Sequence, residues 1–91
     1  MERIREFATS PKNVRFKDLE LLLDNHIRLL FPDYNHHGSA HHTFTLGGRT
    51  FNIAKPHRGF VKKPYIANFL EAMEAVGLFV SGEEENHEHS Q

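Results

Sequence analysis

The sequence predicts a single α+β domain in which helices and a three-stranded antiparallel sheet follow the order α-α-β-β-β-α. Apolar residues recur every three or four positions over 16–25 and 64–76, a spacing typical of helices. They alternate with polar residues over 41–46 and 50–54, which is typical of strands. A chain of 91 residues forms one core. We therefore expect the helices to pack together on one face of the sheet and to leave the other face open.

The helices are predicted from their apolar spacing and from the residues that end them. A short helix over 2–9 stops before a Ser-Pro pair, which is incompatible with a continuing helix. The helix over 16–25 presents a leucine-rich face to the core. In the last helix, Pro64 suits the first turn and Gly77 is placed to end it.

The strands are predicted from alternation and from one turn. Ile27, Leu29 and Phe31 occupy alternate positions and indicate a first strand. The segments 41–46 and 50–54 form the second and third strands, and Gly47-Gly48 between them is typical of a tight hairpin turn.

Charge is unevenly distributed along the chain. The domain is predicted to cover 1–80, with its core over 13–78, followed by an acidic flexible tail at 81–91. The four glutamates of this tail account for the net charge of −1, which would be +3 without them. No acidic residue lies between Asp33 and Glu71, whereas this stretch contains Arg49, Lys55, Arg58, Lys62 and Lys63. Such a basic block is expected to attract a polyanion.

Composition excludes several functional classes. The chain has no cysteine, which excludes disulfide scaffolds, thiolate catalysis and cysteine-based zinc sites. No apolar run reaches the roughly 18 residues that a membrane span requires, so we expect a cytoplasmic protein without a membrane anchor. A domain of this size has little room for a large cofactor cleft, and no cofactor is predicted.

The histidines of the second strand are the first candidates for chemistry. If Phe44 faces the core, alternation directs His42 inward and His41 outward onto the open face, beside Thr43. An exposed imidazole is able to accept and donate protons near neutral pH, as cleavage of an RNA phosphodiester requires. The alternative is that His41 is only a solvated polar residue.

A metal site is the competing interpretation of the paired histidines His36-His37 and His41-His42. Neighbouring residues of a strand point to opposite faces, so only one member of each pair is expected to join a given site. No acidic residue lies within two positions of either pair to complete or orient a ligand set, and no metal is predicted.

The loop between the third strand and the last helix is the candidate phosphate-binding segment. Its cations are Lys55, Arg58, Lys62 and Lys63, and the last two immediately precede a helix whose free N–H groups favour phosphate. His57 provides a second proton-transfer group or a phosphate contact. The alternative is a loop whose charges are only solvated.

Three segments together resemble the HicA family, the mRNA-cleaving toxins of two-component toxin–antitoxin systems. The segments are Asn13 to Leu19 at the start of the leucine-rich helix, Gly38-Ser39-Ala40-His41-His42-Thr43-Phe44, and Lys55-Pro56-His57-Arg58-Gly59 with Val61 to Ile66. The resemblance runs from about Asn13 to Gly77. It implies a fold similar to a double-stranded-RNA-binding domain.

The resemblance also implies a function and a partner. The second segment is similar to the Gly-Ser-His motif of the family. When the two are aligned on Phe44, the catalytic role falls to His41. Ala40 separates Ser39 from His41, so an alignment that starts from Gly38 would instead place Ala40 at the catalytic position. The expected function is a metal-independent endoribonuclease neutralised by a HicB-like antitoxin. The RNA contacts expected are Ser39, Thr43, Lys55, Arg58, Lys62 and Lys63. The alternatives are a non-catalytic RNA-binding module of the same fold and a histidine-rich metal-binding protein.

Overall fold

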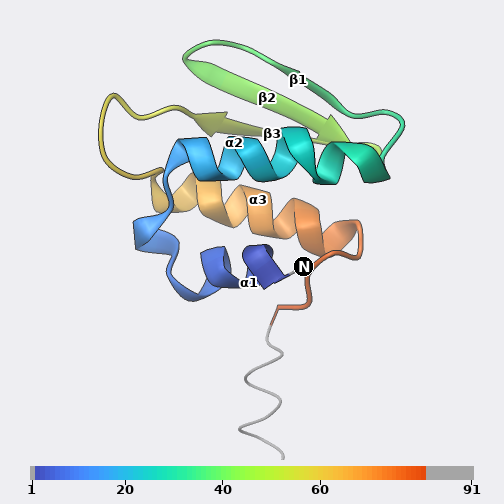
Figure 1. The fold of residues 1–91 in the computed structure, drawn as a ribbon, viewed down its shortest axis with the longest axis horizontal. Coiled ribbons are helices and arrows are strands. Elements are labelled where there is room, and N and C mark those ends of the chain that lie inside the picture. The colour runs from blue at the N-terminus through green and yellow to red at the C-terminus, as the bar shows by residue number, and fades with distance from the viewer. Residues whose placement is uncertain (1, 82–91) are drawn as a thin grey trace, which may run out of the picture.

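The computed structural model describes residues 2–81, so most of the expected acidic tail at 81–91 lies outside the described residues. Three layers follow one another (Figure 1). The sheet forms one outer layer, helices α2 (Phe16–Asn25) and α3 (Lys63–Ala75) lie under one face of it, and α1 (Glu2–Thr9) packs against α3 on the side away from the sheet. A 3-10 turn, Pro11–Asn13, links α1 to α2. The predicted α+β class and the one-sided packing of the helices are confirmed.

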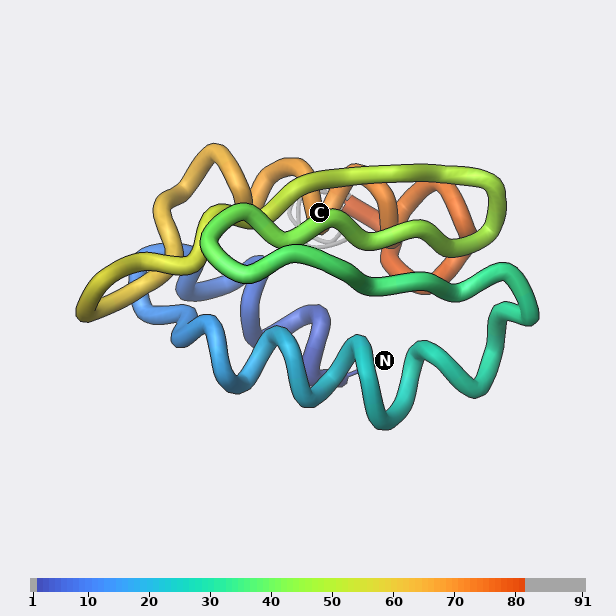
Figure 2. The backbone as a smooth tube through the Cα atoms, turned by 90° about the horizontal axis from the view of Figure 1, so that it is seen from above, coloured from blue at the N-terminus to red at the C-terminus, as the bar shows by residue number. Residues whose placement is uncertain are grey.

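The sheet has the strand order β1-β2-β3 and is antiparallel throughout. Its strands are β1 (Asn35–His37), β2 (His41–Leu46) and β3 (Arg49–Ala54), and the turn between β2 and β3 closes one end of the sheet when it is seen from above (Figure 2). Phe44 lies opposite His36 of β1 and Phe51 of β3. The predicted second and third strands and their Gly-Gly turn are confirmed.

The predicted first strand is wrong. Residues Ile27–Leu30 form a 3-10 helix that continues directly from the end of α2, and the first strand begins later, at Asn35. The Leu29 N–H donates to the His26 carbonyl oxygen at 3.2 Å, as in a helical turn. Ile27 is fully buried but Leu29 is 71% exposed, so the apparent alternation did not mark a buried face.

The core lies between the inner face of the sheet and the helices. Phe44 is completely buried at its centre and stacks on Phe51, with ring centroids 5.5 Å apart. Phe51 in turn meets Phe69 of α3 edge-on at 6.2 Å, and Phe69 meets Phe7 of α1 at 6.1 Å. Aromatic side chains thus connect the sheet to α3 and α3 to α1, so all three layers share one apolar interior.

Asp33 ties the segment before β1 to the hairpin turn. Its two carboxylate oxygens accept the N–H groups of Gly47 and Gly48, each at 2.8 Å. Both glycines have positive φ, 57° and 77°, which a residue with a Cβ rarely adopts. The bond from Gly48, then that from Gly47, lowers the pKa of Asp33 below its usual 3.8.

This contact predicts a pH-dependent contribution to stability. Because the pKa of Asp33 is lower in the folded chain, the stabilisation is present above pH 3.8 and is lost as the pH falls through the folded value. At pH 7 we expect Asp33→Asn to unfold at a lower temperature than the wild type, and we expect the difference to shrink below pH 3.8. Thermal unfolding followed by circular dichroism over a pH series measures this, with Glu71→Gln as the carboxylate control. A difference that stays constant down to low pH would contradict the assignment.

Candidate functional site

The sheet face away from the helices is polar and carries His41. His41 is exposed at the first position of β2, and the next residue, His42, is buried at 7% exposure beside the core. Thr43 returns to the open face, where its hydroxyl donates to Asn52 Oδ1 of β3 at 2.9 Å. The alternation predicted from Phe44, with His41 outward and His42 inward, is confirmed.

A tight turn before β2 fixes the position of these histidines. Gly38 has a φ of 115°, and a Cβ at this position would collide with the backbone carbonyl oxygen of His41. One residue further, the Ser39 carbonyl oxygen accepts the Nε2–H of His42 at 2.9 Å. The Ser39 side chain itself is exposed. The turn therefore requires glycine at position 38. The buried His42 side chain stabilises it through this hydrogen bond.

A groove of about 350 Å³ opens between the start of α2 and the loop that follows β3. Two backbone hydrogen bonds, both 2.8 Å long, hold that loop in place: Lys55 N–H donates to the Ala40 carbonyl, and Val61 N–H donates to the Val14 carbonyl. Four cations and one carboxylate belong to its lining, so the groove is suited to a polyanion. We call it the basic groove, and it is lined by Arg15, Phe16, Lys17, Glu20, Lys55, Pro56, Arg58 and Gly59.

Aromatic rings accompany the cations of the basic groove. The Lys55 ammonium lies 5.8 Å from the centre of the Phe16 ring. The Arg15 guanidinium lies 4.9 Å from the centre of the Phe60 ring, which is 41% exposed. Phe16 is buried, so of these two rings only Phe60 offers an accessible face. An accessible ring beside a cation is typical of surfaces that bind single-stranded nucleic acid.

The predicted basic residues separate into two groups. Lys55 and Arg58 line the basic groove. Lys62 precedes α3 as its N-cap and Lys63 is its first residue, and both are exposed but neither lines the groove. His57 is exposed in the loop between Pro56 and Arg58. The structure therefore brings together only part of the set expected from the sequence.

Arg15 and Lys17 were not among the predicted site residues. They flank Phe16, the first residue of α2, about 40 residues before the basic loop in the sequence. One signal is present in the sequence, because cations at the start of a helix oppose its dipole and are unfavourable there. Arg15 and Lys17 thus do not stabilise the start of α2 through its dipole.

A second polar cluster lies on the inner face, between α2 and the sheet. His36 Nε2 and His42 Nδ1 are 2.7 Å apart. On the other side of its ring, His36 Nδ1 lies 3.0 and 3.1 Å from the two carboxylate oxygens of Asp24 in α2. The Tyr34 hydroxyl donates to the same carboxylate at 2.6 Å. Burial, then the hydrogen bond to Asp24 and its charge, raises the pKa of Tyr34.

No metal site was expected because the sequence places no acidic residue beside the paired histidines. The fold supplies such residues from α2. Asp24 is distant in the sequence from the paired histidines, but α2 places it against His36. Glu20, one turn earlier on α2, joins His36 and His42 in a group whose possible ligand atoms all lie within 4.8 Å of one another. As expected from alternation, each histidine pair contributes one member.

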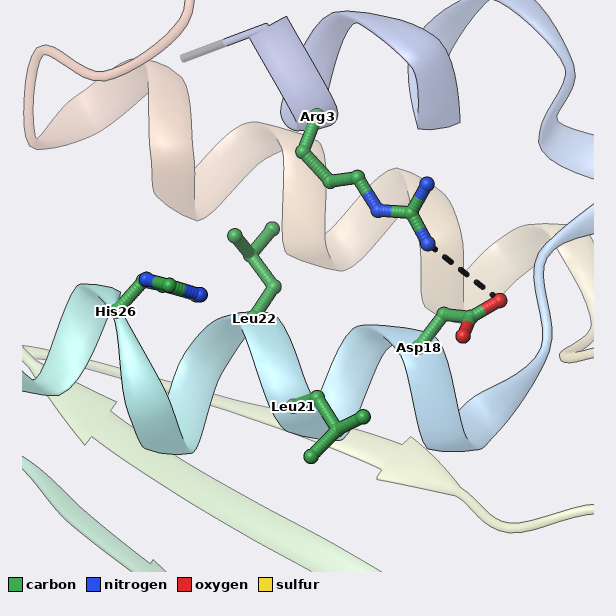
Figure 3. Close-up of a pocket in the computed structure, with 5 residues that line it drawn as sticks. All are labelled: Arg3, Asp18, Leu21, Leu22 and His26. Carbon is green, nitrogen blue, oxygen red and sulfur yellow. Dashed lines mark ion pairs between the residues drawn. The ribbon is translucent and has the colours of Figure 1, made fainter.

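Another hollow, of about 290 Å³, lies between α1 and α2 (Figure 3). Its lining includes Arg3 of α1 and Asp18 of α2, which form an ion pair at 3.5 Å. His26, the residue after α2, lies at its other end. None of the site residues predicted from the sequence lines this hollow.

Comparison with known proteins gives no relative. No protein-family model matches the chain, and no curated protein and no solved structure is significantly similar to it. Among residues 2–81, no helix is both long and apolar enough to cross a membrane.

Proposed function

We propose that this protein is a HicA-like endoribonuclease that binds and cleaves mRNA, with His41 as its catalytic residue. One observation carries the proposal. His41 is exposed at the start of β2, and its partner in β3, Ala54, directly precedes Lys55 of the basic groove. A proton-transfer group and phosphate-binding cations therefore lie at the same end of the sheet.

The proposed chemistry needs only these groups. The cations of the basic groove bind RNA phosphates on either side of the scissile bond. The His41 imidazole removes the proton of the 2′-hydroxyl, which attacks the adjacent phosphorus, or it protonates the leaving 5′-oxygen. His57, exposed in the neighbouring loop, supplies the second proton transfer or a phosphate contact. Ser39 and Thr43, two residues before and after His41, are further proposed RNA contacts, as are Lys62 and Lys63 at the start of α3.

The order of elements supports a double-stranded-RNA-binding-domain-like fold as part of this proposal. The helix α2, three antiparallel strands and the helix α3 follow one another in the order expected for it, and α1 is an addition before them. An enzyme that acts on mRNA would work in the cytoplasm.

RNA cleavage by the full chain tests the proposal. We expect a 5′-labelled single-stranded RNA to be cut in the presence of EDTA, because the proposed chemistry requires no metal. DNA of the same sequence should remain intact, because it lacks the 2′-hydroxyl nucleophile. RNA that is bound but never cut would contradict the enzyme and favour the non-catalytic RNA-binding module.

The proposal includes a protein partner that blocks this surface. A nuclease directed at cellular mRNA must be inhibited in its own cell, and the HicA resemblance implies a HicB-like antitoxin for that role. Because the groove carries Arg15, Lys17, Lys55 and Arg58, the docking face of the antitoxin should be acidic. Such a complex would cover His41 and compete with RNA.

A further inference from the structure

The two facing imidazoles of His36 and His42 have outer nitrogens that must both carry protons. His36 Nδ1 faces the Asp24 carboxylate, and His42 Nε2 faces the Ser39 carbonyl oxygen at 2.9 Å. An ionised carboxylate and a carbonyl only accept hydrogen bonds. Each ring must therefore donate its outer N–H.

The inner nitrogens of the two rings consequently require a positive species between them. A neutral imidazole has a single N–H, so His36 Nε2 and His42 Nδ1 both present lone pairs. They face each other at 2.7 Å, a distance at which two lone pairs repel. The species that relieves this repulsion is either one extra proton or a cation.

The surroundings match those of a bound metal ion. Histidine ligands of metals usually donate their second N–H to a carboxylate or a backbone carbonyl, which fixes the tautomer and the ring orientation. Here the Asp24 carboxylate accepts the outer N–H of His36, and the Ser39 carbonyl oxygen accepts the outer N–H of His42. The rings are also held by aromatic neighbours, since Phe44 stacks on His36 at 4.1 Å and Phe16 contacts His42 at 4.6 Å.

Glu20 supplies a third ligand of the required kind. Its carboxylate belongs to the group within 4.8 Å, and it lies four residues before Asp24 on the same side of α2. Two histidines and one carboxylate, with a fourth position left for water, form a ligand set that zinc commonly uses. Zinc–nitrogen bonds of about 2.0–2.1 Å in a tetrahedron place the nitrogens about 3.3 Å apart, so binding requires the rings to separate slightly.

We propose that Glu20, His36 and His42 bind a divalent transition-metal ion of the zinc class. Two imidazole ligands favour such ions over magnesium or calcium, which prefer oxygen. Glu20 also lines the basic groove, so the bound ion adds positive charge to its wall. The site uses neither His41 nor RNA, and the proposal is therefore independent of the nuclease activity.

Calorimetric titration of the full chain with zinc chloride tests the site. We expect one equivalent to bind, and Glu20→Gln to weaken it by about 100-fold or more, since loss of an outer partner alone typically costs 10–100-fold. Two control variants should keep the wild-type affinity. Glu71→Gln removes an exposed carboxylate from α3, and the double variant His87→Ala, His89→Ala removes the histidines of the C-terminal segment.

The ring nitrogens of the wild type give a second readout that does not depend on any variant. In ¹⁵N spectra of the histidine side chains, zinc should shift His36 Nε2 and His42 Nδ1 and leave their outer nitrogens protonated. Unchanged His36 and His42 signals at one equivalent of zinc would show that only a proton lies between the rings. Binding that survives Glu20→Gln but disappears in the His87, His89 double variant would also overturn the proposal.

Discussion

The His41→Ala variant is expected to lose RNA cleavage, with the rate falling by at least about 100-fold, because positioned proton-transfer groups contribute roughly 10²–10⁴. Its melting temperature should change little. His41 is exposed on the open face of the sheet, and substitutions at such positions usually alter the free energy of unfolding by about 0.5 kcal/mol or less. Gel analysis of labelled RNA gives the rate, and circular dichroism gives the melting temperature.

Two other histidines make this experiment specific. His26 lies between α1 and α2, away from the basic groove, so His26→Ala should cleave RNA at the wild-type rate. His42 is buried and closes the turn before β2, so His42→Ala should lower the melting temperature as well as the rate. Wild-type cleavage by His41→Ala, or loss of cleavage without loss of stability in His42→Ala, would show that the wrong histidine has been assigned.

Neutralising the basic groove should weaken RNA binding and its dependence on salt. Arg15 and Lys55 come from opposite walls of the groove, and each phosphate contact contributes about 0.7 to the salt slope for single-stranded RNA. The double variant Arg15→Gln, Lys55→Gln should therefore flatten the slope by about 1.4 units, which corresponds to roughly 25-fold weaker binding at 0.1 M salt. Fluorescence anisotropy over a salt series measures both quantities.

The control for this variant removes the same charge elsewhere. Arg28 lies in the 3-10 helix Ile27–Leu30 after α2, and Arg49 begins β3. Neither residue lines the groove. Their double glutamine variant should leave the slope nearly unchanged. Equal slopes for the two double variants would mean that RNA responds only to overall charge. The same anisotropy measurement on the double variant Lys62→Gln, Lys63→Gln then tests whether the RNA contacts extend to the start of α3. A flatter salt slope would show that they do.

Local patterns were sufficient for much of the fold. Apolar spacing correctly predicted α2 and α3, and the period of two along β2 correctly separated His41 from His42. These features depend on residues within one or two turns of each other. The alternation over 27–31 failed because three apolar positions are too few to distinguish a strand from a 3-10 helix.

The parts of the site that escaped prediction depend on tertiary contacts. Asp24 and His36 are 12 residues apart and meet only because α2 lies under β1. Arg15 reaches the same groove as Lys55 because the loop after β3 folds back onto the start of α2. No periodicity within either segment carries this information, so sequence patterns identified one wall of the groove and missed the other.

The position of α1 has a consequence for how the molecule opens. An isolated helix of eight residues is too short to persist in water. Ile4 and Phe7, buried against the rest of the core, therefore hold α1 in place. We expect so short a terminal helix to detach at a lower free energy than the whole domain unfolds, and its amides to exchange with solvent first. Because α1 lies on the side of α3 away from the sheet (Figure 1), this local opening leaves His41 and the basic groove intact. We therefore expect the first opening of the molecule to occur on the side away from the proposed chemistry.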